Sequence, residues 1–204
     1  MDMQAKDASA GAATLDEKSK KTLADWIGDM VALETHIGEA LDRQIGEVKD
    51  DPIATTAVRG FQQVAKGQLA AMKTLQEKHG TTPGNPIIKV GAALLGKAAG
   101  IVDNLRAEGV SKIMRDDYTA FNLAAIGYTM LHTTAQALGD NQVAEISKRH
   151  LTGYAAEIQR INQLMPDIVV AELAKDDHKV APGAADATRK IVDTAWKTTD
   201  QSGK

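Results

Sequence analysis

The sequence lacks cysteine and long apolar runs, and each absence excludes a class of protein. Without cysteine the chain has no disulfides and no thiolate chemistry. Residues 1–21 hold no apolar stretch that would serve as a signal sequence. The longest apolar stretch, residues 87–102, is shorter than a membrane span and carries Lys89 and Lys97. We therefore expect a cytoplasmic protein that does not enter a membrane.

An excess of charge of one sign is also missing. The net charge is −3 and the isoelectric point is near 6.0. Binding to nucleic acid depends on a basic surface that neutralises phosphates, and this composition supplies none. We expect no nucleic-acid partner. The length of 204 residues is that of one ordinary domain with tails.

Aromatic residues are scarce, at 3% of the chain, and the apolar residues recur at intervals of three and four, which is the helical period. Asp51 and Pro52 form a helix start, and Gly139 followed by Asp140 ends one helix and caps the next. Thr14 and Glu17 form a capping box for the first helix. We predict an all-α fold with helices over residues 15–48, 52–78, 86–107, 111–138 and 141–165, the last ending or bending at Pro166 before a short terminal piece.

Four long helices joined as two hairpins by a longer crossover form the up-down arrangement of ferritin-like bundles. We assign residues 1–14 to an N-terminal tail, 15–175 to the bundle and 176–204 to a polar C-terminal tail. We expect the C-terminal tail to be mobile, since a short helix is marginal by itself. Its alternative is a short amphipathic helix with Ile191, Val192 and Trp196 on one face.

One carboxylate interrupts the apolar stripe of the first predicted helix. Glu34 lies at helical spacing within a stripe formed by Met30, Leu33, Ile37 and Leu41. A single inward charge is usually paired or hydrogen-bonded, because an isolated buried charge is costly. Lys66 and Tyr154 are the candidate partners of Glu34.

Three segments carry a family resemblance. The first helix has Asp29, then Glu34 five residues later, then Ala40-Leu41; the second has GQL at 67–69; and YTMLHTTAQALG at 128–139 precedes the last long helix. In this order and spacing the chain resembles the YciE/YciF-like ferritin-like family of bacterial stress-associated proteins over residues 23–173. The resemblance implies a ferritin-like bundle and, in many relatives, a pair of metal ions held by Glu and His side chains.

The expected metal ligands are largely missing from this chain. Glu34 is the one ligand retained, and the other positions read QQVAK at 62–66, FNLA at 121–124 and LTGY at 151–154. Two divalent cations in a bundle interior need several carboxylates to neutralise them and to complete their coordination. One glutamate cannot do this, so we expect no metal, no cofactor and no catalytic residue.

The expected function is non-catalytic association, as a homodimer or with a protein partner that the sequence does not identify. The stress context is implied by the resemblance. Small residues at positions 92, 96 and 100 would let helices approach closely, either within the crossover or at a dimer contact.

Two alternatives stay open. A relocated di-iron or di-manganese site of an oxidase or peroxide-handling enzyme could be built from Glu34, Glu157, His132 and His150, although hydrogen-bonded histidines are the more common case. Loss of the metal ligands could instead leave an apolar cavity between the helices that binds a small molecule.

Overall fold

The computed structural model describes residues 15–80 and 109–201, and these residues form helices and no strands. The helices are α1 (Glu17–Glu47), α2 (Pro52–His79), α4 (Val110–Leu138), α5 (Asn141–Lys175) and α6 (Ala184–Gln201). The prediction of an all-α bundle is confirmed. The helix predicted over 86–107 lies outside the described residues.

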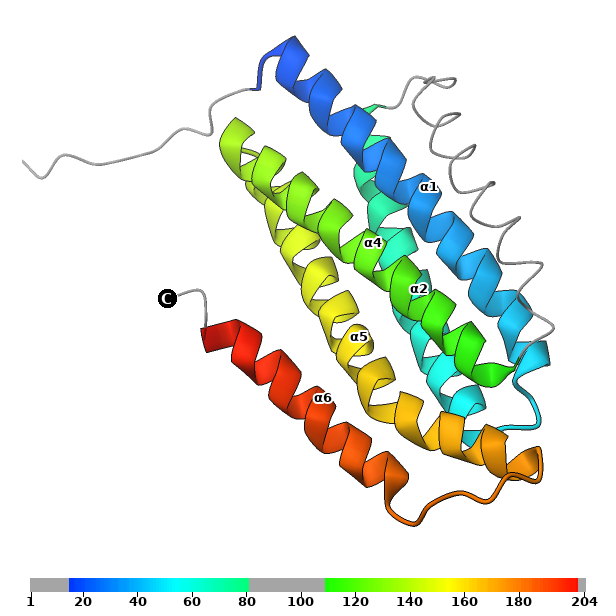
Figure 1. Ribbon diagram of the computed structural model, residues 1–204. Coiled ribbons are helices and arrows are strands. Elements are labelled where there is room, and N and C mark those ends of the chain that lie inside the picture. The colour runs from blue at the N-terminus through cyan, green and yellow to red at the C-terminus, as the bar shows by residue number, and fades with distance from the viewer. Residues whose placement is uncertain (1–14, 81–108, 202–204) are drawn as a thin grey trace, which may run out of the picture.

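The four long helices pack as two antiparallel hairpins, α1 with α2 and α4 with α5 (Figure 1). The hairpins meet through α1 against α4 and through α2 against α5. In Figure 1, α2 and α4 run in the same direction, so the end of α2 and the start of α4 lie at opposite ends of the bundle. Because each long helix contacts two others, each contributes one face to a shared interior.

Local capping explains where α2 and α5 begin. Asp51 accepts a hydrogen bond from the backbone N–H of Ala54 at 2.9 Å, and Pro52 occupies the first turn of α2, as predicted. Gly139 ends α4 in the left-handed conformation, with φ of 82°, and Asp140 then caps α5. These short-range signals set the hairpin boundaries.

Two boundaries differ from prediction. The cap of α1 is Asp16, whose side chain accepts from the backbone N–H of Ser19 at 2.6 Å, rather than a box built on Thr14. Pro166 lies inside α5 without ending it, although Figure 1 shows that the helix changes direction in its C-terminal third. A proline removes one helical hydrogen bond, and tertiary packing on both sides of it can keep the helix continuous.

The interior is filled by aliphatic and aromatic side chains. The largest fully buried ones are Tyr128, Tyr154, Phe61, Phe121, Leu23, Ile27, Leu41, Met72, Leu75, Met114, Leu131 and Ile161. The contact between α1 and α4 is especially close at Gly127. A Cβ atom at this residue would lie 2.7 Å from the Met30 sulfur, so the absence of a side chain is what admits Met30.

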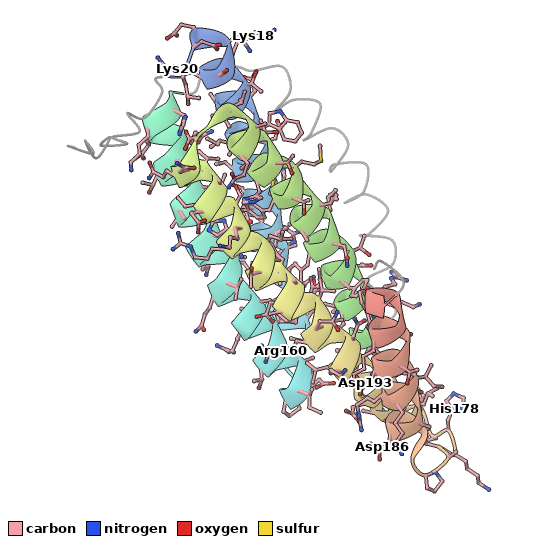
Figure 2. The ribbon with its side chains drawn as sticks, turned by 90° about the vertical axis from the view of Figure 1, so that its left-hand side faces the viewer. Lys18, Lys20, Arg160, His178, Asp186 and Asp193 are labelled. Atoms are coloured by element: carbon pink, nitrogen blue, oxygen red, sulfur yellow. The ribbon has the colours of Figure 1, made fainter. Side chains whose placement is uncertain are left out.

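The C-terminal helix α6 packs against α5, where the sequence analysis favoured a mobile tail. Arg189 of α6 pairs with Asp167 of α5 and with Asp186 of its own helix, and Gln163 donates to Asp193 at 2.7 Å. Figure 2 shows Asp186 and Asp193 on α6 and His178 in the segment before it. The contacts of Arg189 with Asp167 and of Gln163 with Asp193 could not be predicted from the sequence, because they join residues of two different helices.

Candidate functional site

The centre of the bundle holds a buried carboxylate clamped by two tyrosines. Glu34 of α1 is fully buried. The Tyr128 hydroxyl of α4 donates to Glu34 Oε1 at 2.5 Å, and the Tyr154 hydroxyl of α5 donates to Glu34 Oε2 at 2.6 Å. Hydrogen bonds to an ionised acceptor are short and strong, so this cluster ties three helices together at one level.

Burial dominates the ionisation of the cluster. Removal from water raises the pKa of Glu34 to about 7, and the two tyrosine donors act in the opposite direction by favouring the charged form. Burial and the neighbouring carboxylate both raise the pKa of Tyr128 and of Tyr154. The tyrosines therefore stay protonated and act as donors at every physiological pH.

His150 lies beside the cluster as a neutral ring. It packs edge-on against Tyr128 with the ring centroids 5.0 Å apart, and its Nδ1 is buried with no hydrogen-bond partner among the described residues. Burial, with a smaller contribution from Arg149, lowers the pKa of His150 to about 4. The backbone carbonyl of His150 accepts from Gln68 of α2 at 3.3 Å. This contact brings α2 into the same layer as α1, α4 and α5.

Aromatic rings close the other side of the cluster. Tyr154 packs on Phe121 at 5.1 Å between centroids, and Phe121 meets Phe61 edge-on at 5.2 Å. Arg160 lies over the outer side of the Phe61 ring at 5.6 Å. Among the residues that the structure describes, rings therefore enclose the carboxylate.

The sequence analysis identified one of the two partners of Glu34. Tyr154 is confirmed, and Lys66 is wrong: its ammonium lies 3.2 Å from Asp42 on the exposed surface. Tyr128 was missed as a partner, although its helical spacing from Phe121 and Leu131 puts it on the inner face of its helix. That inward position, combined with a hydroxyl that needs an acceptor, was the signal that could have identified it.

The residues of the relocated metal site are not brought together. His132 Nδ1 lies 2.9 Å from the carbonyl of Ala144, and Glu157 lies 3.6 Å from the guanidinium of Arg160. Across residues 15–80 and 109–201, no group of three or more His, Asp or Glu side chains is close enough to hold a metal ion. His150 contacts the Glu34 cluster through the Tyr128 ring.

The side chains around Glu34 do not fit a di-metal centre. They offer one carboxylate, two phenols that burial keeps neutral and one neutral imidazole. A bound cation would have to displace a tyrosine hydroxyl from a carboxylate oxygen, and a single negative charge would then face both ions.

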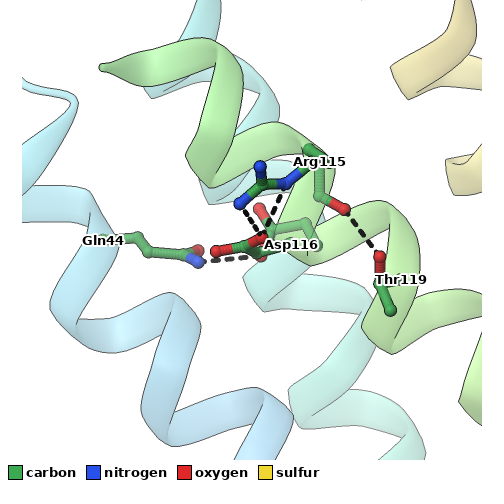
Figure 3. Close-up of polar contacts among 5 residues, drawn as sticks. Gln44, Arg115, Asp116 and Thr119 are labelled. Atoms are coloured by element: carbon green, nitrogen blue, oxygen red, sulfur yellow. Dashed lines mark hydrogen bonds and ion pairs between the residues drawn. The ribbon is translucent and has the colours of Figure 1, made fainter. Parts of the chain in front are cut away.

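A second buried polar contact lies closer to the start of α4. Gln44 of α1 donates to Asp117 at 2.8 Å, and both side chains are buried. Figure 3 shows Gln44 reaching from α1 toward α4, with the surface pair of Arg115 and Asp116 beside it. Like the Glu34 cluster, this contact fixes α1 against α4.

Outside the bundle interior, an apolar groove of about 450 Å³ lies where α6 meets α4 and α5. Tyr118, Met165, Val169 and Val192 are among its lining residues. The groove lies at the edge of the bundle, whereas the cavity considered from the sequence would have been between the four long helices.

The fold and the cluster define the class of protein: an all-α bundle whose central carboxylate is held by tyrosines. The chain belongs to the family described as "Domain of unknown function (DUF892)", whose model matches residues 18–174. YciF-like proteins are members of this family, so the resemblance is confirmed at the family level.

Among solved structures, a protein from Xanthomonas campestris pv. campestris is similar, with a TM-score of 0.63 and 18% identity. The match covers 78% of this chain and 99% of that one. At this identity the likeness shows the fold alone. No curated protein matches the chain. No helix among the described residues is long and apolar enough to cross a membrane.

Proposed function

We propose that this protein is a ferritin-like bundle without a metal centre, which acts non-catalytically by associating with a second copy of itself in a bacterial stress response. The observation that carries the proposal is the closed cluster of Glu34, Tyr128 and Tyr154. The stress context rests on the resemblance to the YciE/YciF-like family.

The charge of the cluster supports the absence of metal. Two divalent ions bring four positive charges, and desolvating them in the interior requires compensation by several anions. Glu34 supplies at most one negative charge, and a pKa near 7 means that even this charge is partly neutralised at physiological pH. The neighbouring phenols and imidazole are neutral, so the cluster favours packing over ligation.

The experiment is metal analysis of the protein purified from cells grown with added iron and manganese. We expect far less than one ion per chain, in the wild type and in Glu34→Gln alike. A pair of tightly bound ions per chain that is lost in Glu34→Gln would overturn the proposal. An exposed-site control, Glu39→Gln on the same helix, distinguishes loss at the cluster from a general effect of removing a carboxylate.

A metal-dependent oxidase or peroxide-handling enzyme is the second candidate. The observation that favours it is the buried His150 Nδ1 next to Tyr128; this nitrogen has no hydrogen-bond partner within residues 15–80 and 109–201. This candidate requires iron-dependent or manganese-dependent consumption of oxygen or peroxide that His150→Gln abolishes. Our first proposal requires no such consumption in either protein.

A further inference from the structure

The outward face of α4 carries no charge over most of the helix. Residues 118–139 include no Asp, Glu, Lys or Arg. Leu123, Ile126 and Met130 are 47%, 55% and 45% exposed, and their spacing of three and four places them on one stripe opposite the core. Scattered exposed apolar residues are normal on soluble proteins, whereas three on one stripe of a helix segment without charged residues form a patch.

The threonine hydroxyls of this face are satisfied inside the helix. The hydroxyls of Thr119, Thr129, Thr133 and Thr134 donate to the carbonyls four residues earlier, at 3.0, 3.0, 2.8 and 2.9 Å. Figure 3 shows this arrangement for Thr119 and the carbonyl of Arg115. With the hydroxyls turned onto the backbone, burying the face would leave none of these groups without a partner.

The other helices of the two hairpins carry exposed charged residues. The exposed residues of α2 include Arg59, Lys66 and Lys73, and those of α5 include Glu145 and Lys148. Burying either surface would require removing these ions from water. The α4 face, which we define as the exposed residues from Thr119 to Ala137, can be dehydrated at much lower cost.

We infer that the α4 face binds the same face of a second copy of this chain about a twofold axis. This inference rests on the proposed function, for which it names the contact surface. In a twofold contact, each residue near the axis meets its own equivalent, so a charge there would face an identical charge. An uncharged face meets its own copy without repulsion, and it offers no charge pattern that would select a different partner.

The length of the face is adequate for a helix pair. Residues 119–137 extend for roughly 28 Å at the rise of an α-helix, with Ile126 near the midpoint. Apolar residues at the centre of the contact and threonines around them match the usual composition of an interface, in which charged residues are depleted from the core. Ile126 is accordingly the residue closest to the expected axis.

The test compares Ile126→Lys with Ile53→Lys. Ile53 is an exposed isoleucine on α2, at 46%, and serves as the matched control. We expect sedimentation equilibrium to show dimers for the wild type and for Ile53→Lys. Two ammonium groups facing each other at the axis should weaken the dimer of Ile126→Lys by roughly a hundredfold or more. Far-ultraviolet circular dichroism checks that each variant is folded.

Single-cysteine cross-linking keeps the test decisive if Ile126→Lys fails to fold. The chain has no cysteine, so Ile126→Cys and Ile53→Cys each carry a single thiol. A short bis-maleimide should join Ile126→Cys into dimers and leave Ile53→Cys monomeric under denaturing electrophoresis.

The outcomes separate this inference from the proposed function. A wild-type dimer that persists in Ile126→Lys, or cross-links only through Ile53→Cys, would overturn the α4 assignment while self-association stood. A wild type that stays monomeric at high concentration would overturn self-association and the α4 face together.

Discussion

The two faces of α4 satisfy their polar groups in opposite ways. On the inner face, the Tyr128 hydroxyl finds its acceptor on another helix, Glu34 of α1. On the outer face, threonine hydroxyls such as that of Thr129 return to the backbone of α4 itself. Polar contacts between helices specify how the bundle packs, whereas contacts within a helix leave its surface free for another molecule. The comparison can be tested residue by residue.

Leu131→Ala should have the largest effect. Leu131 is fully buried on the inner face, and truncation removes apolar contacts and leaves a cavity. We expect the free energy of unfolding to fall by about 2 to 5 kcal/mol, measured by urea denaturation. A change below about 1 kcal/mol would mean that the inner face is not packed as described.

Glu34→Gln should change how stability depends on pH. Burial raises the folded-state pKa of Glu34 from an ordinary 4.5 to about 7, so the folded protein holds this proton more tightly than the unfolded chain. The stabilisation that comes from this proton is fully present below pH 4.5 and is lost as the pH rises through 7. Between pH 5 and 8 the wild type should lose about 2 to 3 kcal/mol relative to Glu34→Gln.

Urea denaturation at several pH values measures this difference. Glu39→Gln, which replaces an exposed carboxylate on the same helix, should follow the wild type throughout. Parallel pH curves for the wild type and Glu34→Gln would contradict the raised pKa.

Tyr128→Phe should remove one donor from the buried carboxylate. Hydrogen bonds to charged groups contribute about 1.5 to 3 kcal/mol, so a loss in that range is expected at pH 8, where Glu34 is ionised. The loss should shrink at pH 5, where Glu34 is protonated. Tyr118→Phe, a partly buried tyrosine on the same helix, is the control and should change stability little. Equal losses for both variants would argue against a specific role of Tyr128.

His150→Gln should have a smaller effect, and the stability should depend on pH in the opposite direction. Burial lowers the folded-state pKa of His150 from 6.5 to about 4, so its contribution is present above pH 6.5 and is lost as the pH falls through 4. Between pH 6.5 and 5 the wild type should lose about 1 to 2 kcal/mol relative to His150→Gln. Nuclear magnetic resonance titration of the His150 ring gives a direct check, and a pKa near 6.5 would disprove the shift.

Met130→Ala should have the smallest effect on folding. Met130 neighbours Leu131 in sequence but lies on the outer face, at 45% exposure. In the Ile126→Lys background, where association is removed, the change in unfolding free energy should stay within about 0.5 kcal/mol. A loss as large as that of Leu131→Ala would show that both faces are buried within one chain.

Much of the fold could be predicted because it depends on local signals. The start of α2 at Asp51 and Pro52, and the junction at Gly139 and Asp140, are set by capping within a few residues. The path of α5 through Pro166 could not be predicted in the same way. The cost of a proline in a helix is local, while the packing that outweighs it comes from distant residues.

The candidate site was also predictable only as far as local sequence signals determine it. Helical spacing alone places Glu34 in the interior. Which hydroxyl reaches it depends on the relative heights of three helices, and these heights are fixed by tertiary packing. Tyr154 and Tyr128 come from two different helices, 120 and 94 residues away along the chain. The prediction of Lys66 as a partner of Glu34 was wrong, because the long side chain of Lys66 holds its ammonium group at the surface beside Asp42.

The glycine at position 127 links the interior of the bundle to its exterior. The Met30 sulfur occupies the space that a side chain at this position would need, so α1 and α4 approach closely at that point. Oxidation of that thioether to a sulfoxide would add a polar oxygen atom at this close contact, so that either the Met30 side chain or α4 would have to move. Oxidation of a single buried atom would then disturb the contact between two helices, and with it the position of the α4 face.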